Sequence, residues 1–296
     1  SATEQAALDW LACGGKRWRP LLTAATYQAL TRSTDAFPRN VERLAVAIEC
    51  FHKASLVHDD IEDDEAERYG RPAVHREYGV PFALNVGDYL IGQGYALIAA
   101  CETTPDKLAR LHAAAADGHR SLSLGQGSEL AWHRQPQPLA VDEALEMFRL
   151  KTAPAFGVAL CLGAIYGDAE EDACDILGEF SEALGIAYQI QDDCDDFSNG
   201  GAHGDAADLR PSVLLALTCE AASAADQGRL ERLLQREDGR KHVAELLQIA
   251  QRSNAGPRAH QLLKHYRSKA IRSLQSLHNT ELKGLLFRLV ARILPQ

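Results

Sequence analysis

The chain has 296 residues, of which 46% are hydrophobic and 24% charged, and this composition is that of a folded globular protein. Its net charge of −10 disfavours nucleic acid and anionic membranes as general partners. Seven scattered cysteines with no C-x-x-C pair argue against a zinc site and predict reduced thiols in a cytoplasmic protein.

Helical periodicity runs through the chain, and no sustained alternation of apolar and polar residues predicts strands. The predicted helices cover residues 4–12, 20–31, 40–64, 81–101, 105–120, 122–133, 139–165, 170–196, 211–223, 228–236, 240–252, 257–276 and 280–293. The longest irregular segments are 66–80 and 197–210. No apolar run approaches the roughly 20 residues of a membrane span, so no transmembrane segment is predicted. The expected fold is all-α, with one domain over residues 1–296.

The first motif in chain order is basic, and reads Gly14-Gly-Lys-Arg-Trp-Arg-Pro20. Its three cations, Lys16, Arg17 and Arg19, surround a glycine pair before a helix start, where unpaired N–H groups and the helix dipole favour an anion. The same residues could also form a simple basic loop. An anion site becomes the better interpretation once a metal motif follows, because a metal-bridged diphosphate needs cations on its remaining oxygens.

An acidic helix end follows, at the close of the stretch from Phe51 to Asp64. Asp59 and Asp63 stand four residues apart and therefore share a helix face, while Asp60 lies on a neighbouring stripe. The cluster is either a solvated helix terminus or a cation site, since acidic side chains at a helix C-terminus oppose the dipole. Mg²⁺ is the best candidate, because it takes one or two carboxylates and bridges to substrate phosphates.

A second acidic helix face lies far downstream, where Asp192 and Asp196 are again four residues apart and Asp193 lies between them. Gln189 precedes them on the same face. Two shorter signals stand between the acidic faces, namely Gly125-Gln-Gly-Ser-Glu129 and Lys151-Thr-Ala153. Lys151 is either a structural counter-ion of the carboxylates or a ligand of a diphosphate.

Together these motifs resemble those of the trans-isoprenyl diphosphate synthases, the polyprenyl synthetase family. The resemblance runs from Gly14 to the arginine-rich last helix, and its motifs follow the family's order, including two D-D-x-x-D motifs that begin at Asp59 and Asp192. It implies a helical bundle around a deep central cavity, usually a homodimer. The implied reaction is a head-to-tail condensation of isopentenyl diphosphate with an allylic diphosphate, with three Mg²⁺ ions bound alongside the substrate diphosphate.

The resemblance also implies a role for each matching residue. The metal ligands would be Asp59, Asp63 and Asp192, supported by Asp60, Asp193 and Asp196. Isopentenyl diphosphate would be held by Lys16, Arg19 and His52, with Arg17 beside them, and the allylic diphosphate by Arg68 and Lys151. Thr152 and Gln189 would place their oxygens near the allylic cation.

Two departures from the family's pattern bear on the condensation step. Tyr69 stands where the family has the second arginine of Arg-Arg-Gly, which leaves Arg71 as a substitute cation for substrate binding. No lysine lies between Lys151 and Lys241, so Arg210 is the cation nearest the second acidic motif. These gaps favour one alternative, a terpene-cyclase-like enzyme that ionises an allylic diphosphate without isopentenyl diphosphate. A second alternative is a non-catalytic partner subunit, against which the two complete aspartate motifs argue.

Product length is predicted from the helix before the first aspartate motif. Ala54 and Ser55, five and four positions before Asp59, are small, whereas in the family a bulky residue there stops growth at C15. Phe51 lies about two turns before Asp59, or ~12 Å along the helix. It is either the next floor of the product cavity or a side chain packed on a neighbouring helix. The expected product is C20–C25.

Overall fold

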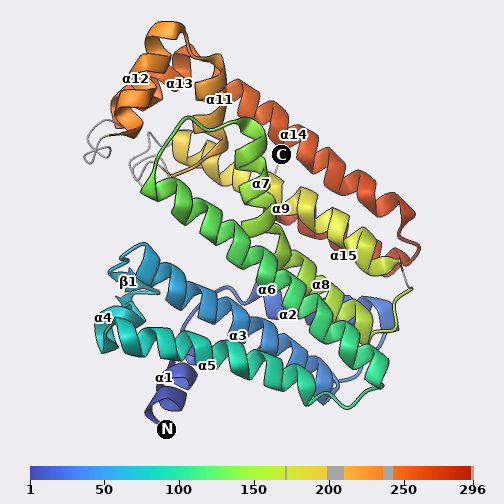
Figure 1. The fold of residues 1–296 in the computed structure, drawn as a ribbon. Helices are drawn as coiled ribbons and strands as arrows, with labels where there is room; N and C mark the ends of the chain where they lie inside the picture. The colour runs from blue at the N-terminus through green and yellow to red at the C-terminus, as the bar shows by residue number, and fades with distance from the viewer. Residues whose placement is uncertain (171, 199–209, 236–242, 295–296) are drawn as a thin grey trace. The chain divides into compact units, whose positions relative to one another are not determined.

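The structure is a computed structural model, and it describes residues 1–170, 172–198, 210–235 and 243–294 (Figure 1). These residues are helical apart from loops and one short hairpin, which confirms the predicted all-α class. They group into two compact units. Unit 1 comprises Ser1–Asp117 and Val158–Cys174, and unit 2 comprises Gly118–Gly157 and the described residues of Asp175–Gln296. The single domain expected over residues 1–296 stays a prediction.

Unit 1 is built around two neighbouring helices, one of which ends in the first acidic motif. Its complete helices are α1 (Ala2–Ala12), α2 (Trp18–Thr31), α3 (Arg39–Glu62), α4 (Val74–Tyr78) and α5 (Val80–Ala99). Helices α3 and α5 lie side by side (Figure 1). Their contact buries a core of Trp10, Cys50, Ala54, Val57 and Leu90. The acidic end of α3 is thereby held on a rigid element.

Glycines set the distance between α3 and α5. Phe51 and His58, seven residues apart on α3, face Gly94 and Gly87, seven residues apart on α5. Seven residues make about two helical turns, so each pair shares one helix face. A Cβ on Gly94 would come within 2.5 Å of the Phe51 ring, and one on Gly87 within 2.2 Å of the His58 ring. Only glycine fits at these two positions without movement of the facing ring.

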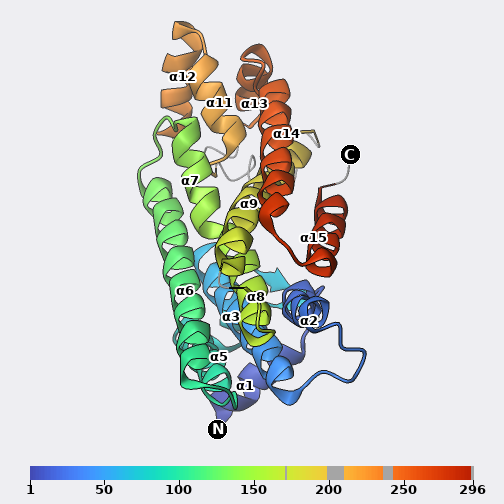
Figure 2. The same ribbon diagram turned by 90° about the vertical axis from the view of Figure 1, so that its right-hand side faces the viewer.

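Three helices contribute residues to both units, namely α6 (Pro105–Arg134), α8 (Ala153–Tyr166) and α9 (Ala173–Ser198). Unit 2 further contains α7 (Val141–Lys151), α11 (Val213–Ala221), α12 (Ala224–Leu234), α13 (Val243–Arg252), α14 (Ala255–Ser273), the 3₁₀ turn η2 (Leu274–Ser276) and α15 (Thr280–Ile293). After η2 the chain turns back, so that α15 packs against α14 (Figure 2).

The structure corrects several predicted boundaries. Helix α6 is continuous where two helices, 105–120 and 122–133, were expected, because no proline interrupts it and a Gly or Ser alone does not end a packed helix. The expected loop 66–80 contains α4 and a two-strand hairpin, β1 (Glu67–Arg68) and β2 (Arg71–Pro72). Elements this short carry no readable period. Of the second expected loop, 197–210, residues 199–209 lie outside the described residues.

The helix expected over 139–165 is in fact two helices that break at Thr152. Pro154 lies in the first turn of α8, a position that suits proline. If the helix were continuous, the proline ring would clash with the carbonyl four residues before it. Two glycines pack against the break. A Cβ on Gly125 of α6 would lie 2.6 Å from the backbone nitrogen of Lys151. A Cβ on Gly185 of α9 would lie 2.6 Å from the Cα of Ala153.

One stretch, Val141–Tyr166, is long and apolar enough by length and composition to cross a membrane, contrary to the expectation from the sequence. That expectation overlooked it because Lys151 and Thr152 interrupt the apolar run. Half of its most apolar window is buried inside the protein. A core helix of a soluble protein passes the same test, so this stretch is weak evidence for a membrane span.

Candidate active site

The first acidic motif lies at the C-terminal end of α3, as predicted. Asp59 and Asp60 are in its last turn, and Asp63 is the C-cap residue. Asp60 is completely buried, and its Oδ1 accepts hydrogen bonds from Nε of Arg68, at 2.8 Å, and from the Nη2 of the same guanidinium. The adjacent Asp64 is paired with Arg76 at 2.7 Å. The chain itself therefore supplies part of the positive charge that this helix end requires.

A tight hairpin turn presents Arg68 to the motif. The turn residues Tyr69 and Gly70 both have positive φ, at 57° and 74°, as a two-residue type I′ turn requires. Left-handed backbone is unfavourable for tyrosine, so contacts of its side chain must hold it there. Arg71, on the second strand, donates to Glu77 and to the Cys13 sulfur, both at 2.8 Å. Its guanidinium is thus already engaged.

The structure brings Arg19 and His52 together, as the predicted roles require. Nη1 of Arg19 lies 3.1 Å from Nε2 of His52, and because arginine can only donate, the ring nitrogen accepts. Burial, together with the charges of Arg19, Lys53 and Arg68, lowers the pKa of His52 to about 3. The imidazole is therefore neutral at physiological pH, and its surroundings are strongly positive.

The remaining residues of the basic motif differ in their contacts. Lys16 is exposed, whereas Arg17 begins α2 and donates from Nη2 to the Leu11 carbonyl at 2.8 Å. Arg17 therefore satisfies the C-terminal end of α1. Of the two residues, Lys16 is the better placed to reach a ligand.

The predicted chain-length residues share one face of α3. Ala54 is buried in the core, and the hydroxyl of Ser55 donates to the His52 carbonyl at 2.9 Å. Phe51 packs into the space above Gly94 and meets the Tyr95 ring edge-on, with centroids 5.0 Å apart. Packing against a neighbouring helix, the simpler expectation for Phe51, is therefore observed.

In unit 2, Lys151 is paired with a carboxylate outside the aspartate motifs. Its ammonium donates to Glu129 of α6, the last residue of the Gly125–Glu129 motif. Burial alone would raise the pKa of Glu129, but the neighbouring His133 ring and the charges of Lys151 and Arg210 outweigh it and lower the pKa to about 2. Glu129 is therefore a permanent anion among three basic side chains.

The helix break brings Thr152 next to Gln189, another predicted pair. The Thr152 hydroxyl donates to the Gln189 side-chain oxygen at 3.3 Å. Because α7 ends at this threonine, its side chain projects from a helix terminus toward α9. The oxygens of Thr152 and of Gln189, which lies just before the second acidic motif on α9, can together face a developing positive charge.

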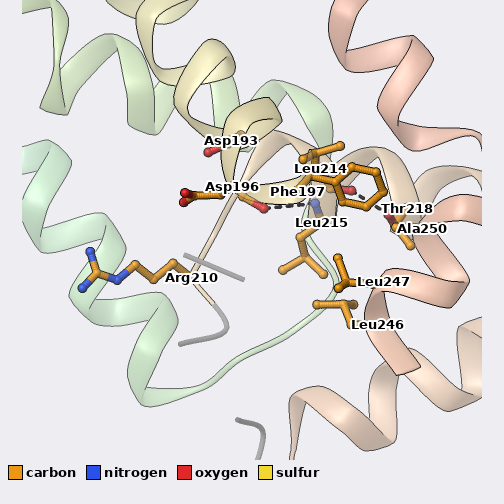
Figure 3. A pocket seen from close by; sticks show the side chains of 11 residues that line it. Asp193, Asp196, Phe197, Arg210, Leu214, Leu215, Thr218, Leu246, Leu247 and Ala250 are labelled. Carbon is orange, nitrogen blue, oxygen red and sulfur yellow. Dashed lines mark hydrogen bonds between the residues drawn. The ribbon is translucent and has the colours of Figure 1, made fainter. Parts of the chain in front are cut away.

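The residues of the second acidic motif have different surroundings. Asp193 is buried, and its Oδ2 accepts a hydrogen bond of 2.7 Å from the Val213 amide at the start of α11. Asp192 and Asp196 are half-buried. Asp196 and Arg210 border a small pocket of about 30 Å³, and their charged ends lie away from its leucine-lined side (Figure 3). A volume of this size holds roughly one water molecule, not a substrate.

The donor set fits Mg²⁺. Among the described residues, no three His, Cys, Asp or Glu side chains form a preassembled metal cluster. Mg²⁺ does not require one, since it binds through one or two carboxylates, waters and substrate phosphates. Asp60 has a second oxygen, Oδ2, that is buried and accepts no hydrogen bond from any described residue. An oxygen left in this way, on the residue that follows Asp59 in the chain, is suited to a cation or to its bound water.

Two ionic residues, one buried and one half-buried, were missed from the sequence. Lys53 is fully buried in α3, one residue after His52, and Glu129 holds Lys151. Lys53 had a readable signal, because Glu49 lies one helical turn before it and both occupy the apolar face of α3. Glu129 had none beyond its weak glycine motif, since its partner lies 22 residues away in the chain.

Comparison with known proteins agrees with these motifs. The polyprenyl synthetase family matches residues 2–250. A short chain isoprenyl diphosphate synthase of Methanothermobacter thermautotrophicus is 29% identical over 93% of this chain and 85% of its own length. Heptaprenyl diphosphate synthase component 2 of Geobacillus stearothermophilus is 30% identical over 95% of this chain and 86% of its own length.

Solved structures give the same result. The crystal structure of geranylgeranyl pyrophosphate synthetase from Pyrococcus horikoshii superimposes with a TM-score of 0.86 at 28% identity, over 99% of this chain and 90% of that one. A decaprenyl diphosphate synthase from Rhodobacter capsulatus superimposes with a TM-score of 0.81 at 25% identity, over 95% and 85% of the two chains. The chain belongs to the polyprenyl synthetase family.

Proposed function

We propose that the protein is a Mg²⁺-dependent prenyltransferase that condenses isopentenyl diphosphate with an allylic diphosphate, head to tail. The observation that carries this proposal is the close succession of unlike charges in unit 1. An acidic helix end with Asp59 and Asp63 adjoins a neutral His52 surrounded by Arg19, Lys53 and Arg68. The carboxylates of the helix end can hold the metal of a metal-bound diphosphate. The cations around His52 can bind a second diphosphate directly.

The proposed roles are those that the family resemblance implies. Asp59, Asp63 and Asp192 would bind Mg²⁺, with Asp60, Asp193 and Asp196 supporting them. Mg²⁺, when bound, would stabilise the negative charge that develops on the departing diphosphate. Arg68 and Lys151 would bind that diphosphate as charge-assisted donors, which requires Lys151 to share its protons between Glu129 and the substrate.

Condensation then needs no covalent nucleophile. The C–O bond of the allylic diphosphate breaks, both electrons leave with the diphosphate, and an allylic cation remains. Lys16, Arg19 and His52 hold the diphosphate of isopentenyl diphosphate, whose double bond attacks this cation. The departed allylic diphosphate then takes a proton from the condensed cation, and a double bond is restored. Thr152 and Gln189 present their oxygens to the cation and stabilise it.

The product is a chain of C20–C25. Small side chains at Ala54 and Ser55 support growth beyond C15, and the Phe51 ring, held between Gly94 and Tyr95, is the proposed floor. A rigidly packed ring is a better stop than a mobile one, because a growing chain cannot turn it aside.

A second candidate is an enzyme of two different chains. One relative is named as component 2 of a heptaprenyl diphosphate synthase, which supports a partner chain of different sequence as an alternative to the expected homodimer. Such a partner would be needed for activity, whereas a homodimer acts alone. A terpene-cyclase-like reaction without isopentenyl diphosphate is the other alternative.

The test supplies purified protein with Mg²⁺, labelled isopentenyl diphosphate, and dimethylallyl, geranyl or farnesyl diphosphate in turn, and sizes the extracted products. Labelled prenyl diphosphates of C20–C25 are expected. Loss of the allylic substrate without incorporation of label would instead establish the cyclase-like reaction. Turnover of neither substrate would contradict a self-sufficient enzyme and favour the two-component alternative.

A further inference from the structure

A buried lysine lies against the glycine loop that joins α1 to α2. Lys53 is 0% exposed, yet its ammonium reaches two backbone carbonyls of this loop. Nζ donates to the oxygen of Cys13 at 3.0 Å and to that of Gly14 at 2.8 Å. Burying a charge costs free energy unless the charge is paired and hydrogen-bonded, so a lysine buried at this position needs an explanation.

Two aromatic rings and one carboxylate complete the surroundings of the ammonium. Nζ lies 4.2 Å from the centroid of Tyr69 and 4.8 Å from that of Trp10, both within the range of cation–π attraction. Burial lowers the pKa of Lys53, and the charge of Glu49, itself only 6% exposed, opposes that shift. The ring contact with Lys53 accounts for the unfavourable left-handed backbone of Tyr69.

The two hydrogen bonds orient the loop. In a trans peptide the carbonyl and the following N–H point in opposite directions, and no cis peptide bond is present among the described residues. Because the Cys13 and Gly14 carbonyls point toward Lys53, the amides of Gly14 and Gly15 point away from it. Both glycines are exposed, and no described residue accepts a hydrogen bond from either amide. Successive outward amides form an anion-binding concavity.

Glycine is required at the second of these positions. Gly15 has a φ of 127°, and a Cβ there would lie 3.2 Å from the Tyr69 hydroxyl. Arg71 also contacts this loop, through the Cys13 sulfur, but its guanidinium is shared with Glu77 and donates to neither the Cys13 nor the Gly14 carbonyl. Among the described residues, Lys53 is the cation that donates to the Cys13 and Gly14 carbonyls.

We propose that Lys53 is a positioning residue of the isopentenyl diphosphate subsite, which holds the Gly14 and Gly15 amides toward the diphosphate while Tyr69 covers its ammonium. This proposal rests on the proposed function for the identity of the ligand. It adds two residues, Lys53 and Tyr69, that act through the loop and not on the reacting atoms.

The test compares Lys53→Met and Lys53→Arg with a matched control, Lys107→Met. Lys107 also lies over a tyrosine ring, Tyr166 at 5.7 Å, and is paired with Asp168, but it does not contact the glycine loop. Binding of isopentenyl diphosphate and of inorganic pyrophosphate is measured by calorimetry without Mg²⁺, and the KM of each substrate is measured by turnover.

Lys53→Met should weaken the binding of both anions about tenfold, the size expected for loss of hydrogen bonds to a charged group. The KM for isopentenyl diphosphate should rise by a similar factor, with the KM for the allylic substrate unchanged. Lys53→Arg should recover part of the affinity, and Lys107→Met should bind as the wild type does. Wild-type affinity in Lys53→Met, or an equal rise of both KM values, would contradict the proposal and show that Lys53 only stabilises the fold.

A second variant covers the case in which Lys53→Met does not fold. Tyr69 is 42% exposed on a surface turn, so Tyr69→Leu should fold, and it should weaken anion binding several-fold by uncovering the ammonium. Unchanged affinity in Tyr69→Leu would contradict the proposal. Pyrophosphate binding needs no turnover, so a wild type that binds pyrophosphate at this loop without condensing substrates would overturn the proposed function alone.

Discussion

At the scale of single residues, burial and the neighbouring charges make the imidazole of His52 a poor base. Burial and three neighbouring cations lower its pKa from an ordinary 6.5 to about 3. Below an unfolded pKa of 6.5 the unfolded chain takes up a proton that the folded protein refuses. Stability is therefore lost as the pH falls from 6.5 toward 3, by at most ~1.4 kcal/mol per pH unit.

Replacement of His52 should remove this dependence. In His52→Gln, whose amide oxygen can still accept from Arg19, the loss of unfolding free energy between about pH 7 and pH 5 should be smaller than in the wild type by about 1–2 kcal/mol. Urea denaturation at the two pH values measures the difference. Equal losses in both proteins would mean that His52 titrates normally.

The Lys151–Glu129 pair leads to a second prediction at this scale. Removal of one partner leaves a half-buried charge without its counter-ion, whereas removal of both does not. A double-mutant cycle with Lys151→Met and Glu129→Gln should give a coupling free energy of about 1–3 kcal/mol in thermal or urea denaturation. Additive effects would show that Lys151 does not depend on Glu129 in the free protein.

The sequence predicted some pairs of neighbouring site residues but not the other partners of those residues. Arg19 with His52 and Thr152 with Gln189 were assigned to shared sites and do lie together. Arg71 was expected to replace a missing cation, but Glu77 already holds it. Motif spacing fixes positions along one helix, while a partner on another element depends on packing that no local pattern records.

At the scale of elements, the glycine contacts of α5 determine how closely α3 can approach. A side chain at position 94 would meet the Phe51 ring, so Gly94→Val should lower the unfolding free energy by about 1–3 kcal/mol through overpacking. Phe51→Ala in the same chain should restore part of this loss. A double variant no more stable than Gly94→Val would show that the two positions are not in contact.

The contact between Phe51 and Gly94 can also be tested through the length of the product. If the Phe51 ring is the floor of the product cavity, Phe51→Ala should shift the product distribution to longer chains, because the space above Gly94 opens. Chromatography of the dephosphorylated products measures the shift. Leu90→Ala, which removes a buried side chain of the core beside α3 but keeps the Phe51 ring, is the control and should leave length unchanged. Identical products from Phe51→Ala and the wild type would remove Phe51 from this role.

Most helices could be predicted because they are long and periodic, and the failures have local causes. Helix α6 runs through a predicted break, and α7 and α8 break within a predicted helix. In the second case Pro154 marked the break, but the break also depends on Gly125 and Gly185, which approach it from other helices. Short elements such as α4 and the hairpin that presents Arg68 have no period to detect.

At the scale of the whole molecule, the family and the all-α fold follow from the order of the motifs, and both are confirmed. Chain length, metal requirement and oligomeric state do not follow from motif order, because they depend on cavity shape, bound ligands and partner chains.

The central claim is that the face formed by Asp59 and Asp63 drives transfer of the prenyl group. The most direct measurement is incorporation of labelled isopentenyl diphosphate by Asp59→Asn, which keeps the side chain's size but removes its charge. The control is Glu62→Gln in the same acidic run. Asp59→Asn should lose at least about a hundredfold in kcat/KM, and Glu62→Gln should stay near the wild type. Equal activity of Asp59→Asn and the wild type would contradict the claim.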